Sequence, residues 1–255
     1  MRLKPSFNEE EPNMEFTSKP ALQTALNHRS IRKYTGEPIP AEMLEIILKA
    51  GQAASTSSFL QSAHIIRVTD MEMRKKLRAV GANQHYIETC AEFLVFCIDF
   101  AKHKQIAPDA QTDWTEMTLM GSIDAGIMAQ NVMLTAESLG LGGVYIGCLR
   151  DDINATNEIL NLPENVVPLF GMSLGWPAQE PMMRPRLPAE CVVTENGYRP
   201  MDKAVYEAYN TQVKDYYKQR SNLDLDFTQQ VRNSLCQEVR PDVLPFLQRK
   251  GLAKR

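Results

Sequence analysis

Two basic segments far apart in the sequence carry the side chains best suited to chemistry. One is the heptapeptide HRSIRKY, and the other is the pentapeptide RPRLP, which its prolines stiffen. Guanidinium groups form charge-assisted hydrogen bonds with phosphates and with the carbonyl edges of planar rings. In a chain of net charge −3, two such segments suit one phosphate held from both sides; solvated arginines and structural salt bridges are the alternative. The residues concerned are His28, Arg29, Ser30, Arg32, Arg184 and Arg186.

Three other segments offer weaker contacts for a ligand. Hydroxyl groups in ASTSSFLQ could donate to ligand carbonyls, or could simply form turns. Backbone N–H groups in GGVYIG are open to a flat ring, although a tight junction between a strand and a loop explains the glycines equally well. Gln84 could supply an amide to a polar ring edge, or could be a surface glutamine.

Several catalytic patterns are missing from the sequence. It contains no G-x-G-x-x-G after the first strand, no G-x-x-x-x-G-K-[ST] and no H-E-x-x-H. These absences disfavour a Rossmann site, a P-loop and a helical metal site. Ser57 and Ser58 show no convincing pairing with His and Asp, so a hydrolase triad has no positive support. The five cysteines are odd in number and form no C-x-x-C pair, which favours buried thiols in a reducing cytosol over disulfides or a zinc site.

Length and composition indicate a globular protein of one or two domains. Of the 255 residues, 44% are apolar and 23% are charged, which are ordinary values. The small negative charge argues against a dedicated nucleic-acid binder, and no apolar run reaches the roughly 18–20 residues that a membrane span needs. Residues 1–20 lack a secretory signal and are interpreted as a flexible arm. We therefore expect a cytoplasmic protein that binds neither nucleic acid nor membrane.

A long central helix is predicted from Asp113 to Leu139, with Gly140 in the position of a C-terminal glycine cap. Its residues are apolar or small around most of its circumference. We therefore expect the helix to be buried from several sides, including by a second subunit. The core helix of a monomer is the alternative.

The rest of the chain predicts few strands and many helices. Helices are expected from Pro40 and after Asp70, whose side chain would cap the second one. Helical segments are also expected near the C-terminus, after a proline-rich loop. Strands are expected in AHIIRVTD, EFLVFCIDF, GGVYIGCL and VVPLFGMSLGW. The fold class is therefore α+β with a central sheet.

Six motifs, in this order, resemble those of the nitroreductase family. They are HRSIRKYTGEPIP, ASTSSFLQ, NQHYIETCAEFLVFCIDF, SIDAGIMAQNVMLTAESLGLGGVYIGCLR, LPENVVPLFGMSLGWP and RPRLP. The most similar subgroup comprises the oxygen-insensitive NADPH nitroreductases and the NADPH–FMN oxidoreductases (flavin reductases). The resemblance runs from about Leu22 to Arg255. Residues 21–255 are thus interpreted as one nitroreductase-like domain with a C-terminal helical extension, preceded by the arm.

The resemblance implies a central, mostly antiparallel sheet flanked by helices, and a homodimer with the long helix at its interface. FMN would bind between the subunits, with its phosphate and ribityl chain at His28, Arg29 and Ser30. Arg32 would lie near the pyrimidine edge of the ring. The other matching residues are Thr56, Ser57, Ser58 and Phe59 at the ribityl chain and ring, Gln84 reaching the ring from the partner region, Tyr145, Ile146 and Gly147 at the reactive edge, and Arg184 and Arg186 at the phosphate.

The activity implied is reduction of nitroaromatics, quinones or related acceptors by two-electron ping-pong transfer, with NADPH or NADH as the electron donor. Hydride passes directly to the flavin, so no side chain is expected to act as a general acid or base, and Arg32 would tune the flavin. One alternative is a flavin reductase that releases reduced FMN to a partner. A second alternative is a flavin carrier or sensor without turnover.

Two departures from the family pattern affect these expectations. Cys148 stands where the subgroup usually has a glycine, and its thiol could narrow the approach to the ring. Arg220 and Arg240 align with arginines that bind the 2′-phosphate of NADPH in relatives, and Ser58 would also contact NADPH or substrate. The loop between these two arginines, SNLDLDF, is acidic where those relatives tend to carry further arginines. The preference for NADPH over NADH therefore stays open.

Overall fold

The computed structural model describes Thr17 and residues 19–255, so the expected arm of residues 1–20 lies almost wholly outside the described residues. At its edge, the backbone N–H of Lys19 donates to the carbonyl of Ser138 at 2.9 Å. A short helix that the sequence pattern did not indicate, α1 (Ala21–Leu26), follows directly.

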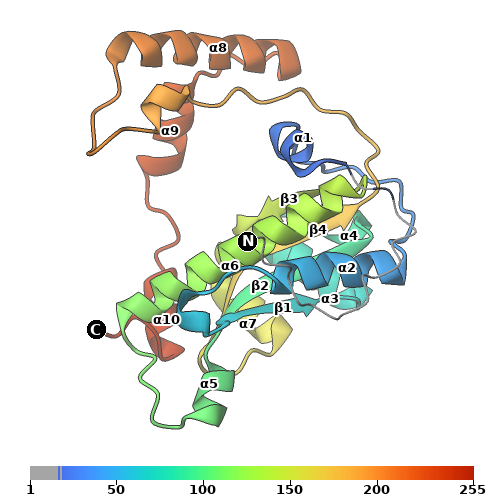
Figure 1. Cartoon of the computed structure of the whole chain (residues 1–255), viewed down its shortest axis with the longest axis vertical. Helices are drawn as coiled ribbons and strands as arrows, with labels where there is room; N and C mark the ends of the chain where they lie inside the picture. The colour runs from blue at the N-terminus through green and yellow to red at the C-terminus, as the bar shows by residue number, and fades with distance from the viewer. Residues whose placement is uncertain (1–16, 18) are drawn as a thin grey trace, which may run out of the picture.

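Four antiparallel strands form a single sheet in the order β1–β2–β4–β3 (Figure 1). The two central strands are the long apolar ones, because only they are hydrogen-bonded on both sides and covered on both faces. Every residue of β2 is buried. The predicted antiparallel sheet is thus confirmed. The strands are β1 (Ala63–Arg67), β2 (Glu92–Asp99), β3 (Gly142–Ile146) and β4 (Val166–Gly175).

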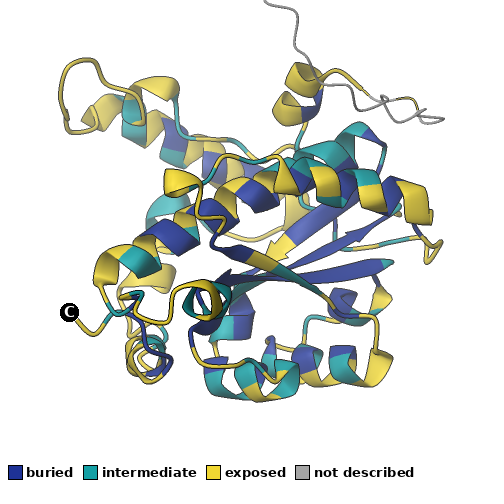
Figure 2. Ribbon diagram, turned by 60° about the horizontal axis from the view of Figure 1, so that its bottom comes forward, coloured by how far each residue is buried: buried dark blue, intermediate teal, exposed yellow. Residues whose placement is uncertain are grey.

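Two layers of helices cover the sheet, and Figure 2 shows the buried residues concentrated between them. One face packs against α2 (Ala41–Gln52) and the long helix α6 (Thr115–Ser138) through alternate strand residues such as Leu94. The other face packs against helices that contact the intervening residues, such as Phe93. These helices are α3 (Met71–Val80), α4 (Tyr86–Thr89) and α7 (Ile153–Leu160).

The predicted helix boundaries are confirmed where local chemistry defines them. Pro40 directly precedes α2. The Asp70 carboxylate accepts hydrogen bonds from two backbone N–H groups in the first turn of α3. Gly140 adopts a φ of 90° just beyond α6, a conformation that glycine takes without steric cost. The short elements between these are η1 (Ser57–Phe59), α5 (Ala101–Ile106), η2 (Gly147–Arg150) and η3 (Ala189–Cys191).

Beyond β4 the chain leaves the body of the fold as residues 178–240, which we call the C-terminal arm. Within the arm, α8 (Lys203–Ser221) and α9 (Phe227–Leu235) pack together, with the rings of Tyr209 and Phe227 centred 5.2 Å apart. Figure 1 shows both helices standing away from the sheet and α10 (Val243–Arg249) returning to it.

All five cysteines are free, and three of them are buried as expected: Cys90, Cys97 and Cys148. Cys191 is half-buried. Cys236 is exposed, so the expectation of buried thiols is wrong there. The reason is its place at the end of α9, a helix with no buried residue of its own.

Candidate functional site

A pocket rich in arginine lies beside the edge strand β3, and we call it the arginine pocket. The extended segment from His28 to Arg32 is fixed to this edge, because the N–H of Ile31 donates to the carbonyl of Gly143 at 2.9 Å. The loop after β4 and helix α8 supply the rest of a lining around about 80 Å³. The charged and hydroxyl-bearing residues of the lining include His28, Arg29, Ser30, Arg32, Arg184, Arg186 and Arg220.

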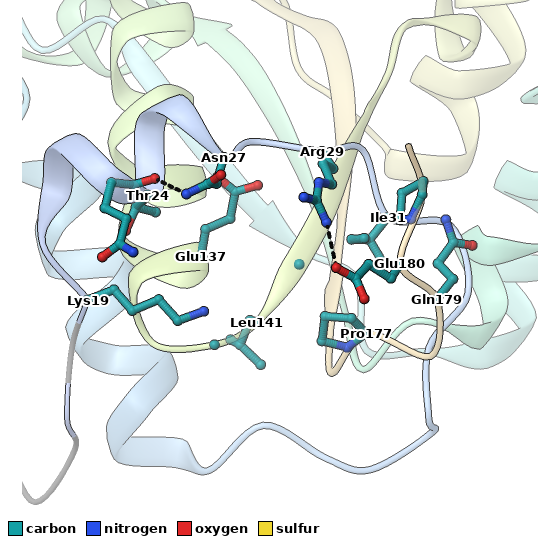
Figure 3. Close-up of a pocket in the computed structure, with 14 residues that line it drawn as sticks. Lys19, Thr24, Asn27, Arg29, Ile31, Glu137, Leu141, Pro177, Gln179 and Glu180 are labelled. Carbon is teal, nitrogen blue, oxygen red and sulfur yellow. Dashed lines mark hydrogen bonds and ion pairs between the residues drawn. The ribbon is translucent and has the colours of Figure 1, made fainter. Parts of the chain in front are cut away.

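The arginine pocket is strongly positive. Among its arginines, Arg29 pairs with a carboxylate: its guanidinium lies 3.1 Å from Glu180 (Figure 3). Within the described part of the chain, the other four arginines of the lining form no ion pair with a carboxylate. Gathering like charges without counter-charges is unfavourable, so such a cluster is typical of a site for an anion.

Helix α8 supports the two arginines of the RPRLP segment. The Tyr209 hydroxyl donates to the carbonyl of Pro185 at 3.4 Å, between the two arginines. The Arg184 guanidinium lies over the ring of Tyr217, 5.9 Å from its centre. The structure therefore brings the two basic segments predicted from the sequence into one pocket, and adds Arg220 from α8 to it.

Arg32 connects the arginine pocket to Gln84. Burial raises the pKa of the Tyr86 phenol, and the nearby Arg32 guanidinium opposes that rise. The Tyr86 hydroxyl in turn donates to the Gln84 side-chain oxygen. Gln84 was expected to approach the ligand from the partner region, yet the structure links it to Arg32 of its own copy.

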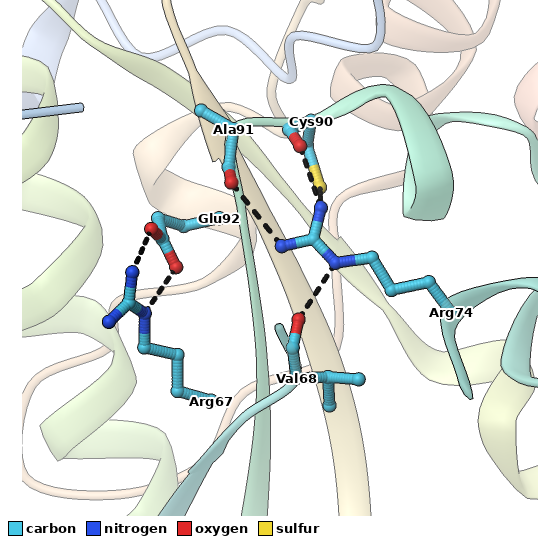
Figure 4. Close-up of polar contacts among 6 residues, drawn as sticks. All are labelled: Arg67, Val68, Arg74, Cys90, Ala91 and Glu92. Carbon is cyan, nitrogen blue, oxygen red and sulfur yellow. Dashed lines mark hydrogen bonds and ion pairs between the residues drawn. The ribbon is translucent and has the colours of Figure 1, made fainter. Parts of the chain in front are cut away.

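A buried arginine anchors the segment that carries Tyr86. Arg74 is 4% exposed and donates to the carbonyls of Val68, Cys90 and Ala91 at 2.7, 2.8 and 3.3 Å (Figure 4). These carbonyls lie at the end of α4 and around the paired strands β1 and β2. A buried guanidinium satisfied by carbonyls in this way fixes the position of α4.

Replacing Arg74 with methionine is expected to lower the free energy of unfolding by about 2 kcal/mol, because the carbonyls lose their buried donor. Lys49 provides a control: it pairs with Glu45 at 3.0 Å across one turn of α2, and both side chains are exposed. Lys49→Ala should cost less than about 1 kcal/mol. Urea titrations of both variants measure the two values, and equal losses would contradict the assignment.

Residues at the end of β3 form a second wall of the candidate site, close to the Arg240 side chain. Tyr145 is 37% exposed and donates to Gln130 at 3.1 Å, whereas Ile146 is buried. A Cβ added at Gly147 would lie 3.8 Å from the nearest guanidinium nitrogen of Arg240.

The thiol of Cys148 turns away from that wall. It is buried and donates to the carbonyl of Gly81 at 3.1 Å. The expectation that this thiol narrows the approach to the ring is therefore wrong, because the chain turns into η2 and directs the side chain into the core.

The loop carrying Thr56 to Phe59 lies apart from the arginine pocket. Asp124, 1% exposed in the middle of α6, accepts from the N–H of Ser57 at 2.9 Å and from the hydroxyl of Ser62 at 2.8 Å. His28, by contrast, contacts Glu137 near the end of the same helix. At 1.5 Å per residue, these two anchors are about 20 Å apart. One copy of the chain thus does not bring this loop to the arginine pocket.

The loop itself is held in an unusual conformation. Ser58 and Phe59 have φ values of 49° and 57°, in the left-handed region that side chains disfavour. The Phe59 ring is 81% exposed. A strained loop that presents a large apolar ring to solvent is typical of a surface that another molecule covers.

Arg220 and Arg240 occupy different places. Arg220 lines the arginine pocket, whereas Arg240 donates to Asp151 at 2.8 Å beside the end of β3. The carboxylates of the intervening loop are engaged locally: Asp224 pairs with Lys214 at 3.0 Å, and Asp226 caps α9. They therefore add less free negative charge than the sequence suggested.

Sequence reasoning missed two residues of this arrangement, Asp124 and Glu137. Both stand in an otherwise apolar stretch of α6, and a carboxylate in such a helix needs a specific partner. A carboxylate within an apolar helix was therefore the sequence feature that could have identified both residues.

No group of three or more His, Cys, Asp or Glu side chains within the described residues is arranged to hold a metal ion. Among the helices that the structure describes, none is long and apolar enough to cross a membrane.

Comparisons with known proteins agree over almost the whole chain. The model of the nitroreductase family matches residues 25–176, and that of its C-terminal domain matches residues 184–255. The NADPH-flavin oxidoreductase of Vibrio harveyi is 52% identical over 236 residues, which cover 92% of this chain and 98% of the relative. The oxygen-insensitive NADPH nitroreductase of Salmonella typhimurium is 45% identical over 92% of this chain and 99% of its own length. A solved structure of the NADPH:FMN oxidoreductase from Vibrio harveyi, complexed with NAD+, superimposes with a TM-score of 0.88 at 50% identity, covering 92% and 99% of the two chains.

Proposed function

This chain belongs to the nitroreductase family, and from that premise we propose that it binds FMN and uses it to carry electrons from NADPH to small-molecule acceptors. The resemblance inferred from the six motifs is thereby confirmed. The chain is an NADPH-dependent flavoprotein oxidoreductase, like the relatives named above. The acceptor class that we propose is nitroaromatics and quinones. Five free cysteines support a cytoplasmic setting.

The observation that carries this proposal is the arginine pocket. Arg32, Arg184, Arg186 and Arg220 converge there without acidic partners among the described residues, and a flavin phosphate would supply the missing negative charge. The hydroxyl of Ser30 adds a donor. The residues present therefore fit the phosphate end of FMN.

The rest of the flavin would extend along the wall formed by Arg32 and β3. When bound, FMN accepts hydride and passes on its electrons in pairs. The chain contributes by placing the Arg32 charge beside Tyr86 and Gln84, where it favours negative charge on the ring. Tyr145, Ile146 and Gly147 would present backbone to the open edge of the ring.

A second copy of the chain would complete this site. Helix α6 exposes Leu119, Ile123 and Ile127, which recur at intervals of four residues and so form one apolar stripe. The Thr56–Phe59 loop cannot reach the arginine pocket of its own copy, so we propose that it reaches the partner's flavin across a dimer centred on α6.

Replacing Ile123 with glutamate is expected to raise the dissociation constant of this dimer by about tenfold or more, because the charge would be buried in both copies. Light scattering across a dilution series measures the shift. Ile106→Glu is the control, because Ile106 is 82% exposed on α5, away from the stripe. An unchanged dimer in the Ile123 variant would contradict the proposed interface.

We propose that Arg240 recognises the 2′-phosphate of NADPH, whereas Arg220, which lines the arginine pocket, is assigned to the FMN phosphate. Local pairing of Asp224 and Asp226 removes much of the expected repulsion. In kinetic terms, Arg240→Ala should raise the KM for NADPH more than the KM for NADH, and an equal rise in both would exclude this role.

Anaerobic stopped-flow spectroscopy tests the function as a whole. NADPH should bleach the yellow protein, and mixing the reduced protein with nitrofurazone or a quinone should restore the colour. Reoxidation by free FMN but not by these acceptors would instead favour a flavin reductase. Failure of NADPH to bleach the protein would point to a carrier, and failure to bind FMN would contradict every flavin role.

A further inference from the structure

His28 stands between the arginine pocket and a buried carboxylate. Its Nδ1 lies 2.7 Å from Oε1 of Glu137, in the last turn of α6. The Glu137 side chain is 10% exposed, whereas that of His28 is 25% exposed and lines the arginine pocket. Because the two ring nitrogens point to different sides of the imidazole, Nε2 is the nitrogen left for a ligand.

Glu137 depends on His28 as its hydrogen-bond donor. Its second oxygen, Oε2, is buried and accepts no hydrogen bond from the residues that the structure describes. A buried carboxylate with a single donor loses a large solvation energy if that donor is removed. An ionised carboxylate can only accept, so Nδ1 must carry a proton.

A phosphate bound in the arginine pocket would require a proton on the other ring nitrogen, Nε2, as well. Phosphate oxygens accept, so Nε2 must also carry a proton to bond with them, and the ring becomes a cation. Free imidazole is mostly neutral at about pH 8. We propose that Glu137 is a positioning residue that makes FMN binding at His28 take up a proton from solvent. This inference rests on the proposed function, because it requires the FMN phosphate in the arginine pocket.

The charges around His28 explain why the proton would arrive with the ligand. Glu137 on α6 favours the cation. The arginines of the pocket oppose it until a phosphate offsets their charge. They come from the same segment as His28, from the loop after β4 and from α8: Arg29, Arg32, Arg184, Arg186 and Arg220.

Isothermal titration of the FMN-free protein with FMN tests the inference. At about pH 8 the FMN phosphate is already a dianion, so it takes up no proton itself. Titrations in HEPES and in Tris, which differ in ionisation enthalpy, should give about one proton taken up per FMN. The Kd should rise up to about tenfold for each pH unit in this range.

Two variants that each remove one negative charge distinguish a specific effect of Glu137 on His28 from a general effect of charge near the pocket. In Glu137→Gln, the side-chain amide can donate a hydrogen bond to Nδ1. The neutral imidazole can then carry its single proton on Nε2 and donate it to the phosphate. FMN should therefore bind this variant with little proton uptake. Glu180→Gln removes a carboxylate from Arg29, does not contact His28, and should keep the full uptake.

Wild-type protein that binds FMN at about pH 8 without proton uptake would overturn the inference, as would unchanged uptake in Glu137→Gln. If Glu137→Gln does not fold, the wild-type stoichiometry and His28→Gln, whose neutral amide can donate without taking up a proton, decide the question. Wild-type protein that binds no FMN at all would count instead against the proposed function.

Discussion

FMN affinity will fall by about a thousandfold or more when Arg184 and Arg186 are both replaced with alanine. Each guanidinium would form a charge-assisted bond worth about 1.5–3 kcal/mol to the phosphate, and about 4 kcal/mol corresponds to a thousandfold change in Kd. Neither arginine has an acidic partner among the described residues, so their removal leaves no buried carboxylate behind. Quenching of flavin fluorescence on titration of the FMN-free protein measures the loss.

Riboflavin, which lacks the phosphate, tests whether the loss of affinity is due to lost phosphate contacts. Wild-type protein should prefer FMN to riboflavin strongly, and the double variant should lose most of that preference. A control with the same change in net charge is Arg199→Ala combined with Arg232→Ala, because both arginines lie on the exposed C-terminal arm and outside the arginine pocket. An equal loss of FMN affinity in this control would show that overall charge, and not the pocket, determines binding.

Much of the fold could be predicted from the sequence because local patterns determine it. Strand β2 is apolar at consecutive positions and is buried on both faces. The long helix was predicted from Asp113 to Leu139 and runs from Thr115 to Ser138, because Gly140 ends it. The order of the sheet was not predictable in this way. Strand β4 lies between β2 and β3. Its pairing with β2 joins strands that are distant in sequence, and no local signal specifies such a pairing.

The candidate site was predictable in its residue types but not in its spatial grouping. From the sequence, His28 and Arg184 were predicted to bind one ligand, and the structure brings them into one pocket. Arg220 joins them only because the chain beyond β4 folds α8 back over the pocket. Asp124 and Glu137 were missed, since their roles depend on which loops pack against α6, and the motifs carry no information about that packing.

Replacing Arg32 with alanine is expected to slow reduction of bound FMN by NADPH about 10²- to 10³-fold, the usual cost of removing one donor from a site of developing negative charge. Arg32 is half-buried beside Tyr86, where water screens its charge only partly. The midpoint potential of the bound flavin should fall in parallel, by about 60 mV for 2.7 kcal/mol in a two-electron couple. Stopped-flow reduction and a dye-equilibration titration measure the two quantities.

The effect of Arg32 on reduction should exceed its effect on FMN affinity, because Arg184, Arg186 and Arg220 would remain to hold the phosphate. Arg32→Lys keeps the charge but not the planar fork, and should recover part of the rate and of the potential. Arg29→Ala is the neighbouring control: its guanidinium is already paired with Glu180, so the potential should change little. An Arg32→Ala variant with normal reduction and normal FMN affinity would show that this guanidinium faces neither the ring nor the phosphate.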